Sequence, residues 1–393
     1  MAGPLKGLKI LDFTTLLPGP YATMMFADLG AEVLRIVSGS RPDLTEFMPP
    51  CIAGTNLSCA AATLGRGKRS LALNLKDPRA VKIIVKLIGS HDILIEQFRP
   101  GVMARFGLDY ETLRTVNPSL IYCSLTGYGQ TGPLKNRAGH DINYLARSGI
   151  GSYSGRKASG PSLTGMQIAD VASGSNNVVI GTLAALVHRQ QTGEGQHVDV
   201  SMTDGVIAFN ALAGAAFLAD GTETRREEGL LNGGSLYDFY ETKDGQHLSF
   251  GGLEPQFFAA FCETIGRPDL IPGGVAPRDL DRIKEDVRAI LRTKTREEWM
   301  VLFGKADACV EPVLALGEAL RDPHVEARGL VVEVGLPGDG KVKQLGHPIR
   351  YSATPPEYRS AGVPAGTHTR EVLRELGYAE SEIDEFAKTG LFA

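Results

Sequence analysis

A βαβ pattern near the start of the chain sets the strongest limit on how it can fold. Leu8–Phe13 and Glu32–Val37 are short runs typical of strands, and Pro20–Leu29 between them is amphipathic. A turn at Gly30 leads into the second strand. Because a single helix between two strands makes a compact crossover unit, the pattern favours a parallel sheet and predicts an α/β fold.

The alternation of strands and helices continues to about residue 200. The segment Met202–Leu218, rich in Ala and Gly, then predicts one long helix packed closely against its neighbours. Within the first 200 residues, further strands are expected at Asp92–Gln97, Leu120–Thr126 and His197–Ser201, and helices at Pro78–Ile88, Tyr110–Val116 and Val171–Gln190.

A second domain follows the charged run Glu223–Glu228, which is interpreted as a solvated linker. Asp244-Gly245 marks a hairpin between Tyr237–Thr242 and His247–Phe250, and three helical patterns follow it. A second hairpin is expected over residues 330–345 and an amphipathic helical tail over 368–388. We therefore predict a large α/β domain at 1–222, a small α+β domain at 223–330 and a C-terminal segment at 331–393.

Composition excludes several classes of protein. A net charge of -4 gives no support for nucleic acid or an anionic membrane as a partner. No apolar run reaches about 18 residues, which predicts no membrane span, and the N-terminal segment lacks a signal-peptide core. A cytoplasmic protein is expected. The 5 Cys residues include no C-x-x-C pair and the 8 His residues no H-x-x-x-H pair, so no metal site is expected.

Cationic residues follow or end several predicted strands. The first βα turn, Leu16–Pro20, lacks the glycine pattern of dinucleotide-binding proteins, and no Walker A sequence occurs. Several cations at strand ends suit a polyphosphate, although ordinary surface charge remains the alternative for each of them. The candidates are Arg35, Lys68, Arg69, Arg99 and Arg105.

The segment Gly139–Tyr144 places His140 beside Asp141, after a Pro/Gly-rich turn and at the start of a predicted helix. An imidazole moves protons near pH 7, and a helix start stabilises negative charge on a substrate oxygen. This pairing suits removal of a proton from a carbon next to a carbonyl group. Asp170 and Glu254 each precede or begin a predicted helix, where a structural capping role competes with a catalytic one.

Together these segments resemble the family III CoA-transferase superfamily and, within it, the α-methylacyl-CoA racemases. The resemblance extends over nearly the whole chain. It rests on Leu17–Pro20, Ala27–Val33, Arg66–Ser70, Arg99–Val102, Gly139–Tyr144, Gly252–Phe257, Ala308–Val313 and Gly346–Arg350.

The resemblance implies an isomerase of lipid metabolism that epimerises 2-methyl-branched acyl-CoA thioesters. His140 and Asp170 would be the two bases, Glu254 would orient His140, and the N–H of Asp141 would stabilise the enolate oxygen. No organic cofactor is implied, because CoA is part of the substrate. The five cationic candidates above would bind the CoA moiety.

The family architecture implied is an interlocked homodimer. Its large Rossmann-like domain combines N- and C-terminal parts, so that the segment 331–393 returns to it. Glu254 would then lie near His140 of the other chain. Two alternatives remain open: a CoA-transferase that uses Asp170 as a nucleophile, and a non-catalytic acyl-CoA-binding protein.

Overall fold

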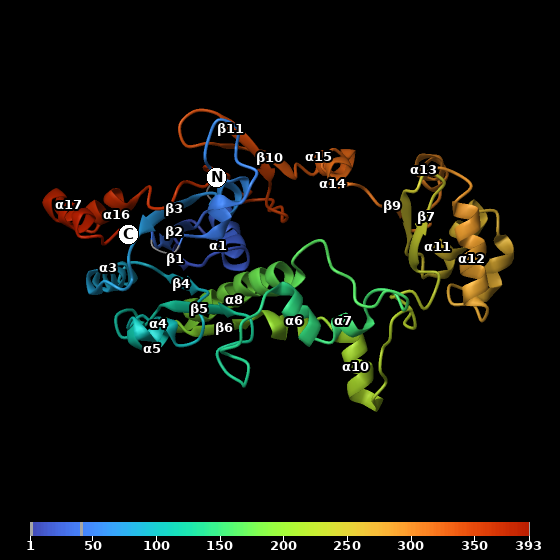
Figure 1. The fold of residues 1–393 in the computed structure, drawn as a ribbon, viewed down its shortest axis with the longest axis horizontal. Helices are drawn as coiled ribbons and strands as arrows, with labels where there is room; N and C mark the ends of the chain where they lie inside the picture. The colour runs from blue at the N-terminus through green and yellow to red at the C-terminus, as the bar shows by residue number, and fades with distance from the viewer. Residues whose placement is uncertain (1–2, 40–41, 393) are drawn as a thin grey trace. The chain divides into compact units, whose positions relative to one another are not determined.

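The structure is a computed structural model that describes residues 3–39 and 42–392. The chain forms two compact units (Figure 1). The large unit extends to Leu145, resumes over Gly165–Ala208 and is completed from Glu326 onward, and the small unit comprises Ala146–Thr164 and Phe209–Val325. The predicted boundary at residue 222 therefore lies inside the small unit, and the segment 331–393 lies in the large one.

The segment 146–164 belongs to the small unit because later side chains hold it there. Arg226 donates to the carbonyl oxygens of Ser154, at 2.8 Å, and Gly151, at 2.6 Å. Arg156 forms an ion pair with Asp238. Because these contacts join residues far apart in the sequence, local sequence patterns do not reveal them. The prediction from those patterns therefore placed the segment in the large domain.

Six parallel strands form the sheet of the large unit, in the order β3-β2-β1-β4-β5-β6. The predicted parallel α/β sheet is confirmed, and its strand order is that of the Rossmann fold. A strand that the sequence patterns did not predict, β3, forms one edge. The strands are β1 (Lys9–Phe13), β2 (Glu32–Val37), β3 (Lys68–Ala72), β4 (Ile93–Glu96), β5 (Ile121–Thr126) and β6 (His197–Ser201).

Helices and one hairpin complete the large unit. The π-helix η2 (Ile168–Ser175) leads directly into the long helix α8 (Asn176–Thr192). Two short helices, α6 (Asp141–Arg147) and α15 (Pro323–Ala327), span points where the chain passes from one unit to the other. The others are α1 (Pro18–Asp28), η1 (Leu44–Phe47), α2 (Cys59–Leu64), α3 (Pro78–Ile88), α4 (Val102–Arg105), α5 (Tyr110–Leu113), α9 (Met202–Ala208), α16 (Thr369–Glu375) and α17 (Glu380–Lys388), with the hairpin β10 (Val331–Gly335) and β11 (Lys341–Leu345).

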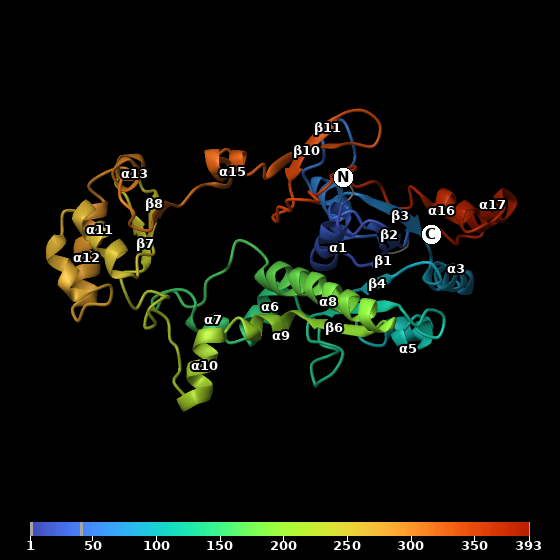
Figure 2. The same cartoon turned by 180° about the vertical axis from the view of Figure 1, so that it is seen from behind.

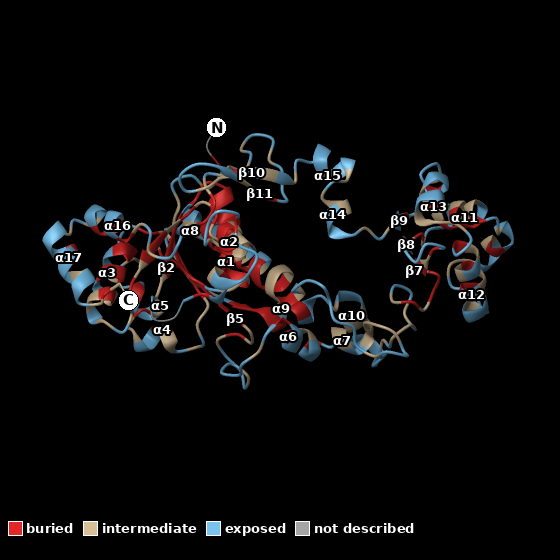
Figure 3. Cartoon of the chain, turned by 45° about the horizontal axis from the view of Figure 1, so that its top comes forward, coloured by how far each residue is buried: buried red, intermediate tan, exposed pale blue. Residues whose placement is uncertain are grey.

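The sheet is buried between helices (Figure 3). On one face, apolar side chains of β1, β2 and β3 pack with α3, α16 and α17 in a single core cluster. Elsewhere α1 contacts β2, and α8 lies along β5 and β6 and also contacts α1 (Figure 2). The C-terminal helices therefore complete the core of the N-terminal sheet.

The small unit has an antiparallel sheet, β7-β8-β9, covered by helices. Its core contains Trp299, whose Nε1 donates to the Leu291 carbonyl oxygen at 2.8 Å, and the stacked rings of Phe250 and Phe261. The elements are α7 (Ile150–Tyr153), α10 (Ala211–Asp220), β7 (Asp238–Glu241), β8 (His247–Phe250), α11 (Pro255–Thr264), η3 (Pro268–Gly273), α12 (Leu280–Leu291), α13 (Arg296–Phe303), β9 (Val310–Pro312) and α14 (Leu316–Ala319).

The prediction of one long, closely packed helix over Met202–Leu218 is wrong. The segment forms α9 and α10, separated at Phe209 and Asn210, and α10 has no buried residue. The Asn210 side chain accepts from the Tyr153 hydroxyl at 2.8 Å and donates to the Ser148 carbonyl oxygen at 3.0 Å, which favours a break in the helix. Among the described residues, no single helix is long and apolar enough to cross a membrane; α9 and α10 meet that test only when taken together.

Candidate active site

The candidate site begins where the strand order of the sheet reverses, between β1 and β4. In open α/β sheets, ligands bind beyond the carboxyl ends of the strands at such a point. The Gly19 N–H donates to Gln97 Oε1 at 3.1 Å, which joins the first turn of α1 to the residue that follows β4. A Cβ atom on Gly19 would lie 2.3 Å from the Thr14 Cβ, so this close approach requires glycine.

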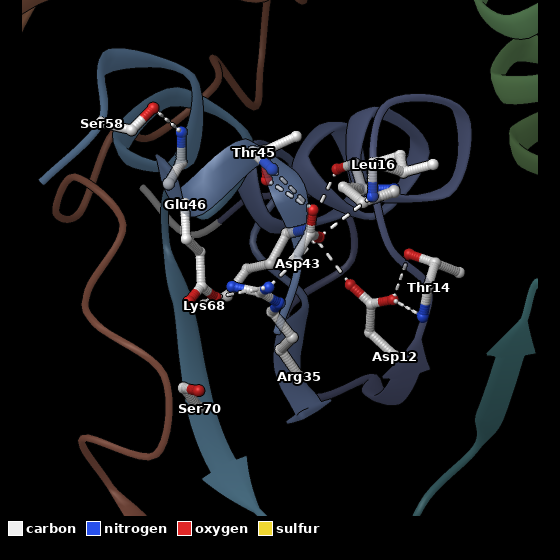
Figure 4. A network of polar contacts seen from close by, with 12 residues as sticks. Asp12, Thr14, Leu16, Arg35, Asp43, Thr45, Glu46, Ser58, Lys68 and Ser70 are labelled. Carbon is white, nitrogen blue, oxygen red and sulfur yellow. Dashed lines mark hydrogen bonds and ion pairs between the residues drawn. The ribbon is translucent and has the colours of Figure 1, made fainter. Parts of the chain in front are cut away.

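A polar network supports the loop after β1 (Figure 4). Leu16 has a φ of 62°, in the left-handed region that non-glycine residues rarely adopt. Its N–H donates to Asp43 Oδ2 at 3.0 Å, and the Arg35 guanidinium lies 3.3 Å from the same oxygen. Asp43 therefore ties the strained turn to β2 and fixes the entrance to α1.

Two of the predicted CoA-binding residues, Arg35 and Lys68, belong to this buried network. Besides Asp43, Arg35 pairs with Glu46 at 2.9 Å. Lys68 Nζ lies 3.1 Å from Asp12 Oδ2 and donates to the Thr23 hydroxyl at 2.6 Å. Both cations already have internal partners, so a phosphate would have to compete with them. Their role in CoA binding stays a prediction.

The other three predicted cations differ in location. Arg69 lies near the amino end of β3, away from the carboxyl ends, and pairs with Glu371 and Glu375 on α16. Arg99 follows β4 and Arg105 ends α4, and both are exposed. Within residues 3–39 and 42–392 neither of these two forms an ion pair. By position and availability, Arg99 is the strongest of the five candidates.

His140 immediately precedes α6 and is exposed. Its N–H donates to Asn143 Oδ1 at 3.0 Å, and its carbonyl oxygen accepts from the Asn143 N–H at 2.8 Å. The hydroxyl of Tyr144 donates to the Gly139 carbonyl oxygen at 2.6 Å and closes the turn before His140. A Cβ on Gly139 would lie 2.6 Å from the Tyr144 ring, so glycine is required there.

Asp141, the first residue of α6, contacts the start of the π-helix η2. Its buried carboxylate Oδ1 accepts from the N–H of Ala169 at 2.6 Å and from the N–H of Asp170 at 3.1 Å. Among the described residues, the N–H of Asp141 itself makes no hydrogen bond. A free N–H at a helix start is the group expected to stabilise an oxyanion.

Asp170 is half-buried on η2 rather than at a helix N-cap. The structural alternative of N-capping is therefore wrong, because the Asp141 carboxylate accepts from the N–H groups at this end of the helix. Burial, followed by the negative charge of Asp141, raises the pKa of Asp170 to about 6, while His140 acts in the opposite direction. π-Helical turns occur frequently at functional sites.

Hydrogen bonds fix η2 in the large unit. Ser175 Oγ donates to the Pro18 carbonyl oxygen at 2.6 Å, which joins the π-helix to the turn after β1. Ser173 Oγ donates to the Met202 carbonyl oxygen at 2.6 Å, at the start of α9. These contacts gather the strand-order reversal, Asp170 and the His140–Asp141 pair in one region.

Glu254 lies in the small unit, at the N-cap position of α11, and is exposed. Its side chain does not cap that helix. A hydrogen bond from the Gly251 N–H to the Cys309 carbonyl oxygen, at 2.9 Å, holds the loop before Glu254. The pKa of the Cys309 thiol is raised, first by loss of solvent and then by nearby negative charges that include Glu254. The proposed action of Glu254 on His140 stays a prediction.

Sequence reasoning missed three parts of this site: the Asp141 carboxylate, Gln97 and Tyr144. Burial, then the nearby Asp170, raises the pKa of the Tyr144 hydroxyl to about 12, and Arg99 acts against this. Tyr144 is part of the Gly139–Tyr144 segment, which was the available signal. For Gln97, the only signal was its position as the last residue of the predicted strand Asp92–Gln97.

A model of CoA-transferase family III matches residues 5–369. Human alpha-methylacyl-CoA racemase is 34% identical over 382 residues, covering 96% of this chain and 95% of that protein. Mouse succinyl-CoA:glutarate CoA-transferase is 33% identical over 397 residues, covering 99% and 90%. The crystal structure of a CAIB/BAIF family protein from Brucella suis matches with a TM-score of 0.84 and 26% identity, covering 96% of this chain and all of the other.

Proposed function

This chain belongs to CoA-transferase family III, and we propose that within this family it is a racemase of 2-methyl-branched acyl-CoA thioesters. A thioester carbonyl acidifies the hydrogen on the adjacent carbon. One base removes this proton to give an enolate, and an acid on the opposite face returns a proton, so that the stereocentre inverts. We assign these two roles to His140 and Asp170.

The observation that carries this proposal is the environment of Asp170. A carboxyl group whose pKa is about 6 is present in both protonation states near neutral pH. It can therefore donate a proton in one direction and accept one in the other. A nucleophilic carboxylate works in its ionised form, which burial and a second negative charge disfavour.

Other residues complete the proposed mechanism. The N–H of Asp141 donates to the enolate oxygen, and Arg99 binds the CoA moiety, whose remote binding energy positions the reacting carbon. Glu254 orients His140 from the partner chain of an interlocked homodimer. CoA enters as part of the substrate, so the reaction proposed here requires no organic cofactor.

A CoA-transferase is the second candidate. It is supported by a relative named as a succinyl-CoA:glutarate CoA-transferase at almost the same identity as the racemase. In that reaction Asp170 would attack the thioester and carry an acyl group and then CoA. We favour the racemase because a carboxyl group with a pKa of about 6 can both give and take a proton near neutral pH.

Incubation of the enzyme with one epimer of a 2-methylacyl-CoA in heavy water separates the two. A racemase inverts the centre and introduces deuterium at the α-carbon without any added carboxylic acid. A transferase requires an added carboxylate and moves CoA onto it while leaving the α-carbon unchanged. Transfer without inversion would overturn the racemase proposal.

A further inference from the structure

Glu96 is a buried carboxyl group at the end of β4 that the mechanism above does not use. It is 4% exposed, and burial raises its pKa to about 7. Ionisation of a buried carboxyl group costs stability, and a glutamine of the same shape would avoid that cost. Stability therefore does not explain a glutamate at this position, and such costs are accepted at functional sites.

The carboxyl group of Glu96 holds the turn that follows β4. Its Oε2 accepts from the Phe98 N–H at 2.7 Å, two residues further along the chain. Gln97, between them, accepts from the Gly19 N–H, and the Phe98 ring packs against the core of the large unit. Arg99 comes next and is exposed. Two side chains, Gln97 and Glu96, therefore fix the backbone that presents Arg99.

A chain of hydrogen bonds links the same carboxyl group to the edge of the sheet. Ser124 lies opposite Glu96 in the register of β4 and β5, is 2% exposed, and makes a hydrogen bond with the carboxyl group through its hydroxyl. Ser124 Oγ lies 2.9 Å from Nε2 of His197, on the edge strand β6. The exposed His197 ring stacks on Tyr110, with ring centroids 5.7 Å apart. Three neighbouring strands therefore connect a buried carboxyl group to a histidine at the surface.

Ser124 can donate only one hydrogen bond, because its hydroxyl has one hydrogen. When Glu96 is ionised, Ser124 donates to the carboxylate, and Nε2 of His197 must carry a hydrogen to donate to Ser124. When Glu96 is protonated, it can donate to Ser124, and the Ser124 hydroxyl then donates to Nε2. The ionisation of Glu96 and the tautomer of His197 are therefore coupled.

Other ionisable side chains lie on the strands beside this chain of hydrogen bonds. They are Lys9 and Asp12 on β1, Tyr122 and Cys123 on β5, and Asp199 on β6. Among these, Asp199 acts on Glu96, and its charge disfavours the carboxylate. The Ser124 hydroxyl and the Phe98 N–H act in the opposite direction. These two donors are therefore what favours the ionised form of Glu96.

We propose that Glu96 is a positioning residue for CoA binding: its carboxylate fixes the turn that presents Arg99, and Ser124 and His197 act through it. This role rests on the proposed function, in which Arg99 binds the CoA moiety. It applies to a racemase and to a transferase alike, because both act on CoA thioesters.

Calorimetry with CoA at about pH 8, above the pKa of Glu96, tests the role of the carboxylate. In Glu96→Gln the amide oxygen still accepts from the Phe98 N–H, but the charge is gone. CoA affinity should fall by about 5-fold, because a charge-assisted hydrogen bond is roughly twice as strong as a neutral one. Ser124→Ala removes a donor to the carboxylate and should weaken CoA binding by about 3-fold.

Ser119→Ala is the matched control, because the Ser119 hydroxyl also donates to a side chain of the large unit, that of Asn117. Its CoA affinity should equal that of the wild type. In Glu96→Gln, KM for the acyl-CoA should rise while kcat hardly changes, as expected when only binding is weakened. A role in folding alone would change stability and leave the CoA affinity of the folded protein intact. CoA affinity in Glu96→Gln equal to that of the wild type would overturn the proposal.

The tautomer of His197 tests the link through Ser124 and does not depend on turnover. ¹⁵N NMR distinguishes a ring with its hydrogen on Nε2 from one with it on Nδ1, and the signals are assigned by their loss in His197→Phe. The wild type at about pH 8 should carry the hydrogen on Nε2. In Glu96→Gln the amide N–H donates to Ser124, so Ser124 donates to Nε2 and the Nδ1–H form should predominate. The same tautomer in both proteins would refute the link.

The outcomes also separate this proposal from the proposed function. If the wild type binds CoA but does not invert an epimer, the racemase assignment fails, and weaker CoA binding by Glu96→Gln still supports the positioning role. If Arg99→Ala binds CoA as tightly as the wild type does, the turn does not act through Arg99 and the positioning role fails.

Discussion

The hydroxyl of Ser175 donates a hydrogen bond to the carbonyl oxygen of Pro18, at 2.6 Å. This contact joins the π-helix that carries Asp170 to the turn after the first strand of the sheet. The turn is itself held by Gln97, at the end of a neighbouring strand. The proposed acid is thus attached to the strand-order reversal, where α/β sheets bind their ligands.

His140→Ala should lose most of the isomerisation, by roughly 10²-fold or more, because it removes one of the two proton carriers. Acyl-CoA affinity should hardly change, since His140 is assigned to the chemical step. Inversion is followed by polarimetry and affinity by calorimetry. His188→Ala, which changes an exposed histidine on α8, should behave as the wild type. Nearly normal turnover in His140→Ala would remove His140 from the mechanism.

Arg99→Ala should weaken CoA binding by about 1.5–3 kcal/mol, the usual contribution of a hydrogen bond to a charged group. Arg99 is exposed, follows β4, and forms no ion pair within the part of the chain that the structure describes. Calorimetry with CoA measures the change. Arg370→Ala is the matched control, because Arg370 is an exposed arginine already paired with Asp384. Equal CoA affinity in the wild type and Arg99→Ala would refute the assignment.

Glu96 gives a prediction for stability against pH. It is 4% exposed at the end of β4, and burial raises its pKa to about 7 from an ordinary value of 4.5. The folded protein therefore binds more protons than the unfolded chain between these values, and stability falls as the pH rises through this window. Glu96→Gln removes this loss, so its free energy of unfolding relative to wild type should rise by about 3 kcal/mol between pH 4.5 and pH 8.

Urea unfolding at several pH values measures this difference. Glu194→Gln, which changes an exposed glutamate, should follow the wild type at every pH. A constant difference between Glu96→Gln and wild type across this range would show that Glu96 ionises normally in the folded protein.

Much of the sheet could be predicted, because apolar runs and turns are local signals. The bounds of β2 and β6 agree with the sequence patterns. In contrast, β3 begins with Lys68 and Arg69, which look like part of a charged turn. Lys68 is nevertheless buried, because Asp12 and Thr23 supply partners from β1 and α1. No local pattern reveals such a long-range pair.

The same limit applies to the site. His140 and Asp170 were found from their residue types, positions and family resemblance. The contact between the Asp141 carboxylate and the start of η2 could not be found, because it joins backbone groups 28 and 29 positions away in the chain. A π-helical turn at Asp170 also lies outside the reach of patterns based on a period of 3.6 residues.

Asp170→Asn separates the racemase from the transferase most sharply. In a racemase Asp170 only carries a proton, so its loss should abolish inversion. His140 can still remove and return the α-proton on its own face. The variant should therefore exchange the α-proton of one epimer for deuterium without inverting it, which mass spectrometry and chiral analysis detect together.

The wild type offers the complementary measurement. A transferase forms a covalent acyl or CoA adduct on its aspartate, and hydroxylamine traps that adduct and inactivates the enzyme. A racemase forms none, so hydroxylamine with acyl-CoA should leave its activity unchanged. We expect this second outcome, because a carboxyl group with a pKa of about 6 can both give and take a proton near neutral pH, as the proposed racemase mechanism requires. Inactivation of the wild type with an adduct on Asp170 would replace the racemase assignment with the transferase.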